Sequence, residues 1–192
     1  MKIIYFLPLL ILETSALSIG SRGLALIKKY ESFKAKTYYC PAGKLTIGYG
    51  TTTDDESVIG TKIKPGMTIS EKQASLWLQI SLNKKYAPKV NKYNGKYHWT
   101  QNEFDALVSF AYNSGSIDEL CAHGKRSKSQ IADAMLKYVK ANGKVLPGLV
   151  NRRREERQLF LSGGSSAINK EFGKNSLNQF AKEVINDEWD RI

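Results

Sequence analysis

The sequence predicts a mixed α+β fold with a small β-hairpin lobe and a mostly helical lobe. Three features support this prediction: an amphipathic run early in the chain, a turn between two strand-like segments, and helix-start signals that recur through the remainder. The 192 residues, 42% of them hydrophobic and 24% charged, suit a single globular domain with short appendages. Since ligands often bind where two structural units meet, we expect a cleft between the lobes.

The first lobe is expected near residues 18–68. An amphipathic helix is predicted over 24–33, because Leu24, Ile27 and Tyr30 recur at helical spacing. Glu31 lies near its C-terminal end, where the helix dipole disfavours a carboxylate. A hairpin is predicted next, with the turn-forming run Pro41-Ala42-Gly43 between the segments 37–39 and 45–49.

The remainder of the chain, beyond Gly66, is predicted to be almost wholly helical. Serine or threonine followed three residues later by glutamine or glutamate is typical of a helix N-terminus, because each side chain bonds the other residue's free backbone N–H. Pro147 opens another predicted helix, since proline suits the first helical turn. The pairs with this spacing are Ser70 with Gln73, Thr100 with Glu103, Ser127 with Gln130, and Ser176 with Gln179.

Both ends of the chain are predicted to lie outside this domain. Lys2, the apolar stretch 3–12 and the small residues 14–16 have the layout of a signal peptide or signal-anchor-like segment over 1–17, which predicts export. The stretch is too short for a spanning helix of about 20 residues, so a transient membrane contact or packing on the domain are the alternatives. A C-terminal helical extension is expected over 164–192; packing on the helical lobe is favoured over binding a partner.

The chain carries a formal net charge of +11, from 29 Lys and Arg against 18 Asp and Glu. Such a surface attracts anionic polymers or membranes, although its cations can also simply solvate helix faces. No nucleic-acid partner is expected, because no motif combines basic residues with interleaved aromatics. Two cysteines are too few for a disulfide-rich scaffold. The cysteines and the two histidines lack the spacing of a zinc site, so we expect a protein without metal or cofactor.

Glu31, Cys40 and Thr46 are the candidate catalytic residues. They lie at the end of the predicted helix, at the hairpin turn and on the second strand, so they can converge at the mouth of a cleft. Hydrolysis of a glycosidic bond needs a carboxylic acid that protonates the leaving oxygen and a second group that positions or deprotonates water. Taken alone, a single glutamate on an amphipathic helix is more often a solvated surface residue.

Three ordered segments resemble the phage-type lysozymes, the bacteriophage endolysin family of glycoside hydrolases. In that family a glutamate is followed nine residues later by aspartate or cysteine and six further on by threonine, as Glu31, Cys40 and Thr46 are here. The resemblance covers roughly residues 18–162 and identifies 18–163 as the lysozyme domain. Its segments are 23–50, Asn102 to Gly115, and Gly148 to Phe160.

This resemblance implies a lysozyme-like fold and a monomeric muramidase. Such an enzyme hydrolyses the β-1,4 bond between N-acetylmuramic acid and N-acetylglucosamine in bacterial peptidoglycan, usually with inversion. Glu31 would be the general acid, Cys40 would replace an aspartate, and Thr46 would help to hold water or substrate. Arg152 is implied as the partner of Glu31. Tyr112 and Asn113 match the segment that lines the sugar cleft, although both could equally be members of a buried helix.

The role of Cys40 is left open by the sequence. It could act as a thiolate with a lowered pKa, position water, or serve as a small buried residue; an ordinary thiol, with a pKa of about 8.5, is only a few per cent ionised near pH 7. In an oxidising compartment Cys40 could instead pair with Cys121 and block the site until it is reduced. The alternatives to a muramidase are a non-catalytic cationic protein that binds cell wall or membrane, and a chitin hydrolase.

Overall fold

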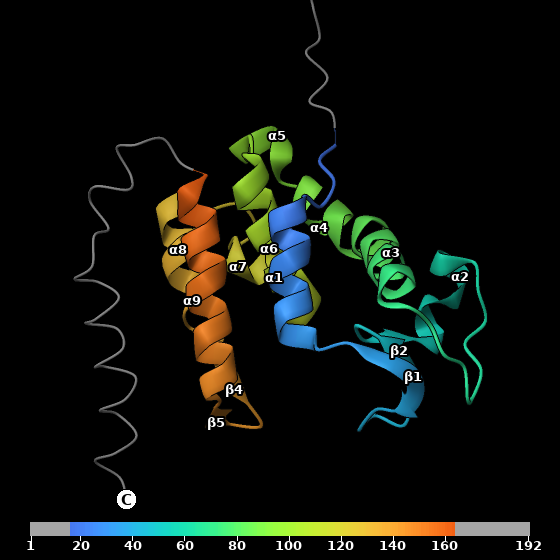
Figure 1. The fold of residues 1–192 in the computed structure, drawn as a ribbon. Helices are drawn as coiled ribbons and strands as arrows, with labels where there is room; N and C mark the ends of the chain where they lie inside the picture. Colours follow the sequence, from blue (N-terminus) through green and yellow to red (C-terminus); the bar gives the residue numbers. More distant parts are fainter. Residues whose placement is uncertain (1–15, 164–192) are drawn as a thin grey trace, which may run out of the picture.

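The computed structural model describes residues 16–163, which form two lobes joined by a long helical run (Figure 1). The larger lobe contains α1 (Ser21–Glu31), α5 (Asn94–Tyr97), α6 (Gln101–Ser114), α7 (Ile117–Leu120), α8 (Lys128–Met135) and α9 (Pro147–Ser162). The smaller lobe holds β1 (Lys34–Tyr39), β2 (Leu45–Gly48), β3 (Thr51–Thr52), the short turn η1 (Thr53–Asp55) and α2 (Glu56–Ile59). The joining run consists of α3 (Glu71–Ser81), η2 (Leu82–Tyr86) and α4 (Ala87–Asn91). The predicted α+β architecture is confirmed.

The first helix packs on the helical lobe rather than on the sheet, which corrects the expected lobe boundary. α1 lies against α6 and α9 (Figure 1). The backbone N–H groups of Gly20 and Gly23 donate to the two carboxylate oxygens of Asp105 on α6, at 2.8 and 2.9 Å. A Cβ at Gly23 would lie 2.8 Å from that of Asp105, so glycine permits the close approach. The helix ends at Glu31, earlier than predicted, because Ser32 has a φ of +53°.

The predicted hairpin is confirmed, and a third strand extends it. β1 and β2 pair antiparallel, with Tyr38 opposite Thr46. β2 is buried along its whole length, where it packs against α3. The sequence analysis did not predict β3, which pairs with the other edge of β2. Gly50, with a φ of +91°, lets the chain reverse between β2 and β3.

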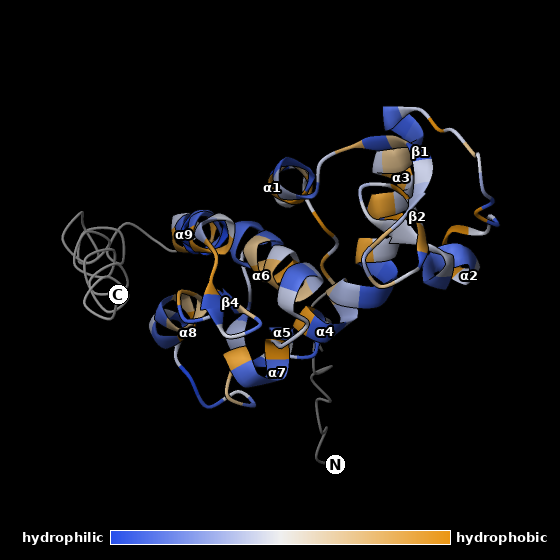
Figure 2. Ribbon diagram, turned by 90° about the horizontal axis from the view of Figure 1, so that it is seen from below, coloured by the Kyte–Doolittle hydropathy of each residue, from blue (hydrophilic) through white to orange (hydrophobic). Residues whose placement is uncertain are grey.

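Three of the four predicted helix starts are confirmed. The Ser70 side chain accepts a hydrogen bond from the Gln73 backbone N–H at 3.1 Å. Thr100 and Ser127 form reciprocal capping boxes at the starts of α6 and α8. Pro147 begins α9, which Figure 2 shows almost end-on beside α6 and α8. The fourth pair, Ser176 with Gln179, lies outside the described residues.

Two local features depart from the predicted helical lobe. The helical run 71–91 contains a π-helical segment, η2, between two α-helical ones. A second hairpin, β4 (Lys140–Ala141) with β5 (Lys144–Val145), interrupts the helices ahead of α9. Asn142 and Gly143 form its turn with φ values of +52° and +79°. An Asn-Gly pair is a strong hairpin signal, since both residues tolerate positive φ.

Leu17, near the N-terminal end of the described residues, is bonded to the joining helical run. Its backbone N–H donates to the Asn91 side chain at 3.0 Å, and its carbonyl accepts from the same side chain at 2.8 Å. Most of the predicted segment 1–17, and the predicted extension 164–192, lie outside the described residues. Within residues 16–163, no helix has the length and apolar character needed to cross a membrane.

Candidate active site

The cleft between the lobes contains a pocket of about 350 Å³. Glu31 reaches it from the last turn of α1, and Gly50 and Asp55 line it from the smaller lobe. Tyr112 and Asn113 line it from the end of α6. Side chains that are far apart in the sequence therefore meet in one concave site, as the sequence analysis expected for Glu31, Tyr112 and Asn113.

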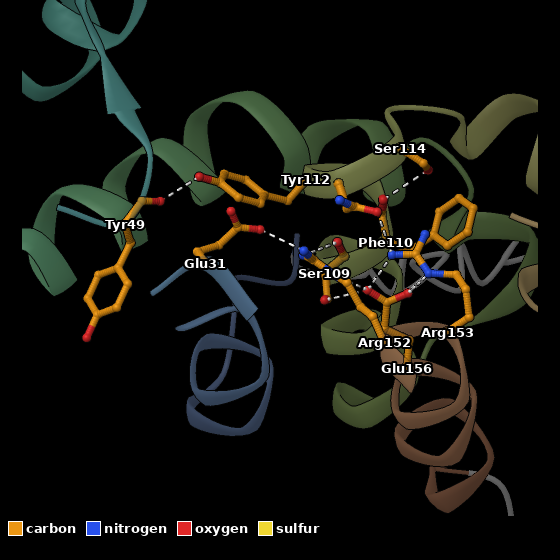
Figure 3. Close-up of polar contacts among 10 residues, drawn as sticks. Glu31, Tyr49, Ser109, Phe110, Tyr112, Ser114, Arg152, Arg153 and Glu156 are labelled. Carbon is orange, nitrogen blue, oxygen red and sulfur yellow. Dashed lines mark hydrogen bonds and ion pairs between the residues drawn. The ribbon is translucent and has the colours of Figure 1, made fainter. Parts of the chain in front are cut away.

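The carboxylate of Glu31 is held on one side and open on the other (Figure 3). Its Oε1 accepts a hydrogen bond from Nη1 of Arg152 at 2.7 Å, and the two side chains are 23% and 4% exposed. The predicted pair is therefore present. Oε2 lies on the side of Gly50, where a Cβ would be 4.0 Å from it. Within residues 16–163 the carboxylate is anchored through Oε1, and Oε2 accepts no hydrogen bond.

Arg152 is itself fixed by groups from three elements. Its Nε donates to Oε1 of Glu156 at 3.1 Å, and its Nη2 donates to the Ser109 carbonyl at 3.4 Å. Its guanidinium carbon lies 5.5 Å from the centre of the Tyr30 ring, within reach of a cation–π contact. A guanidinium held on several sides cannot rotate away from Glu31, so it restricts the position of that carboxylate.

Glu156 is the central anion of the cluster behind the cleft. Its side chain is fully buried, and it accepts hydrogen bonds from Arg152, Arg153 and the Ser109 hydroxyl at 3.1, 3.1 and 2.8 Å. Burial raises the pKa of the Glu156 carboxyl, whereas the two guanidinium groups act in the opposite direction. The two buried arginines, Arg152 and Arg153, are thus accompanied by two carboxylates, those of Glu156 and Glu31.

Tyr112 and Asn113 differ in how they face the cleft. The Tyr112 hydroxyl donates to the Tyr49 carbonyl in the smaller lobe at 2.8 Å, and its ring meets that of Tyr86 edge-on at 5.2 Å. Burial raises the pKa of Tyr112 well above its usual range. Asn113 is exposed, and its Oδ1 accepts a hydrogen bond from Arg153 at 2.9 Å. Their predicted contact with substrate stays a prediction.

Cys40 and Thr46 lie together on the hairpin and are not among the residues that line the pocket with Glu31. Lys44, between them in sequence, does line it. A backbone hydrogen bond from Lys44 and the side chain of Thr46 lower the pKa of the Cys40 thiol. The catalytic roles of Cys40 and Thr46 stay predictions.

The two cysteines are free thiols in the structure. Cys121 follows α7 in the core of the helical lobe, where burial raises its pKa to about 12. Cys40 lies in the hairpin of the other lobe and is only partly buried. This arrangement does not contain the disulfide that the sequence analysis considered.

Sequence analysis missed a partly buried ion pair in the wall of the pocket. Asp55 accepts hydrogen bonds from Lys85 on η2 at 2.6 Å and from the Ser81 hydroxyl at 3.0 Å. Burial acts to raise the pKa of Asp55, but the bonds from Lys85 and from the Thr52 backbone outweigh it and hold the pKa below its usual range. The spacing of Thr52 and Asp55, which form a capping box, was the available signal. Within 16–163, no three His, Cys, Asp or Glu residues are grouped to hold a metal.

A helical lobe, a small antiparallel sheet and a glutamate in the cleft between them define a protein of the lysozyme fold. The chain belongs to the phage lysozyme family, whose sequence model matches residues 28–156. The matched range includes Glu31, the hairpin, α6, and Arg152 and Arg153 of α9.

Individual relatives agree with this assignment. The chain is 35% identical to the endolysin of Bacillus phage B103, over 88% of this chain and 64% of that protein. It is 32% identical to the endolysin of Salmonella phage P22, over 76% of this chain and 99% of the relative. The solved endolysin of Escherichia coli O157:H7 phage FAHEc1 is similar with a TM-score of 0.63 at 36% identity, over 77% of this chain and 96% of that one. The chain thus spans just under two thirds of the B103 protein.

Proposed function

We propose that the protein is an endolysin-type muramidase that hydrolyses the β-1,4 bond between N-acetylmuramic acid and N-acetylglucosamine in bacterial peptidoglycan. The observation that carries this proposal is the position of Glu31, in the cleft and bonded to the nearly buried Arg152 at 2.7 Å. Membership of the phage lysozyme family supports the same reaction. A cleft open between two lobes suits a polymeric substrate that passes across it.

Glu31 is proposed as the general acid. Protonated at Oε2, it would deliver its proton to the glycosidic oxygen as the bond to the anomeric carbon breaks. The carboxylate that remains gains a negative charge, and Arg152 lies in place to stabilise it through Oε1. Arg152 therefore favours the state that forms during bond cleavage over the resting acid.

The water is proposed to attack the opposite face of the sugar, with inversion. Thr46 and Cys40 would position it, and a lowered pKa increases the share of Cys40 present as thiolate, the form that can accept a proton. No cofactor is required for this route, because acid, water and stabilising charge all come from the chain and solvent.

The cellular setting is also part of the proposal. The segment 1–17 would export a monomeric protein and make at most a transient membrane contact. The net charge of +11 would then draw it to the polyanionic cell wall, and nucleic acid is not a partner.

Glu31→Gln tests the proposal, because the amide keeps the size of the side chain and cannot donate the required proton. Purified peptidoglycan is digested, and the new reducing ends and their anomeric form are identified. We expect new muramic acid ends in the inverted form from the wild type, none from the variant, and equal wall binding by both. Glu155→Gln, a change at a half-buried residue of α9 that pairs with the exposed Lys29, is the control. Undiminished hydrolysis or bacterial killing by Glu31→Gln would refute the proposed role, and a wild type that binds walls without cleaving them would favour a non-catalytic binder.

A further inference from the structure

Two neighbouring arginines on α9 share the buried Glu156 (Figure 3), and each also contacts a different residue of the cleft. Arg152 donates to Glu156 and to Glu31. Arg153 donates to the same Glu156 oxygen at 3.1 Å and to Oδ1 of Asn113 at 2.9 Å. The reaction proposed above uses Arg152 and assigns nothing to Arg153.

Arg153 is enclosed on several sides within its site. Its side chain is fully buried, and its Nε lies 2.9 Å from Oε2 of Glu156. Its guanidinium carbon lies 4.7 Å from the centre of the Phe110 ring, which covers one face of the group. A guanidinium fixed on these sides presents Nη2 to Asn113 in one direction only.

This contact determines which way the Asn113 carboxamide is turned. A guanidinium has donors and no acceptor, so the atom that faces Arg153 must be the amide oxygen. The Nδ2 group, with two N–H donors, is left on the other side of the carboxamide. Asn113 is exposed and lines the pocket, and no group in residues 16–163 accepts a hydrogen bond from Nδ2.

We propose that Arg153 is a positioning residue for the substrate, which holds Asn113 so that its Nδ2 donates to an acceptor oxygen of the sugar chain. The acceptor of matching chemistry in the proposed substrate is the carbonyl oxygen of an N-acetyl group, a strong neutral acceptor that has no donor of its own. An unconstrained asparagine would present oxygen or nitrogen at similar cost. This inference rests on the proposed function for the identity of the sugar.

Asn113→Asp and Asn113→Leu separate this role from a structural one. Aspartate keeps an oxygen for Arg153 and removes both donors, whereas leucine removes the donors and leaves Arg153 without its partner. We expect both variants to raise KM for soluble peptidoglycan fragments about tenfold, the effect of one ordinary hydrogen bond, with a smaller change in kcat. Only Asn113→Leu should lower Tm. A KM equal to that of the wild type in Asn113→Asp would overturn the proposal.

Arg153→Lys tests the positioning residue itself without removing its charge. The single ammonium keeps a partner for Glu156 but loses the fork that reaches Asn113. We expect a raised KM, and no further rise when Asn113→Asp is added, because both changes remove the same donor. Rises that multiply in the double variant would refute the link between the two residues.

The same variants made in the Glu31→Gln background keep this inference separate from the proposed reaction. Binding of the same fragments is then measured by titration, with no hydrolysis. Weaker binding by Asn113→Asp supports the inference even where the wild type fails to cleave peptidoglycan. Equal binding overturns it even where cleavage is established.

Discussion

Glu156→Gln is expected to destabilise the protein far more than an equivalent change one residue away. The variant keeps the size and one acceptor oxygen of the side chain, but it removes the charge that faces Arg152 and Arg153. Those arginines are 4% and 0% exposed at their side chains, so water cannot replace the lost charge. Removing one partner from a buried ion pair costs about 3–5 kcal/mol.

The size of this loss can be measured by thermal and urea unfolding followed by circular dichroism. For a domain of this size each kcal/mol lowers Tm by about 2–4 °C, so a fall of roughly 10 °C is expected. Glu155→Gln is the matched control, because its pair with Lys29 is largely exposed and such pairs contribute at most about 1 kcal/mol. Equal losses of stability in the two variants would refute the reasoning that the buried cluster depends on Glu156.

Three further predictions concern the pocket and the neighbouring hairpin. Asp55→Asn should lower the free energy of unfolding by about 2 kcal/mol, because Lys85 loses its charged partner. The folded-state pKa of Asp55 lies below the unfolded value, so the stability lost in Asp55→Asn, measured by urea unfolding, should be largest above about pH 4 and shrink as the pH falls. A loss of stability that stays the same in acid contradicts the reasoning. Gly50→Ala should lower both activity and Tm, since φ is +91° and the new Cβ would lie 2.9 Å from the Tyr112 hydroxyl. Gly43→Ala, with φ of +74° and no atom within 4 Å of the new Cβ, should lower Tm alone. Equal losses of activity in the two variants would count against the role of Gly50. The rate of Cys40 alkylation, followed by mass spectrometry, should rise with a midpoint below the ordinary thiol value of about 8.5, and a midpoint at or above that value would be contrary evidence.

The parts of the fold that depend on local rules were predictable from the sequence. The caps at Ser70, Thr100 and Ser127 depend on residues three positions apart, and α1 and the hairpin depend on short-range periodicity and turn chemistry. The strand β3 has only two residues, too few to show a period. The π-helical segment η2 is a change in hydrogen-bond register that apolar spacing does not reveal.

The site was predictable only in part, for a different physical reason. Resemblance to a family indicated the pairing of Glu31 with Arg152, which are separated by 121 residues in sequence. The run of charged residues that follows Asn151 resembles a solvated helix face, yet Arg153 and Glu156 are fully buried. Their burial depends on Ser109 and Asn113 of α6, which supply polar partners inside the lobe. These polar partners come from distant parts of the chain, so no local sequence pattern reveals that the charged residues are buried.

The carboxylate of Asp105 on α6, which bonds the N-terminal end of α1, bears on how the two lobes could move apart. Through Gly20 and Gly23 it ties the helix that carries Glu31 to α6, while Arg152 ties the other end of that helix to α9. Glu31 and its cationic partner are therefore both held on the helical lobe. If the sheet swung outward to admit a glycan strand, the bond between Tyr112 and the Tyr49 carbonyl would break, but the bond between Glu31 and Arg152 need not. The proposed proton donor would then keep its partner while the wall opposite it opened.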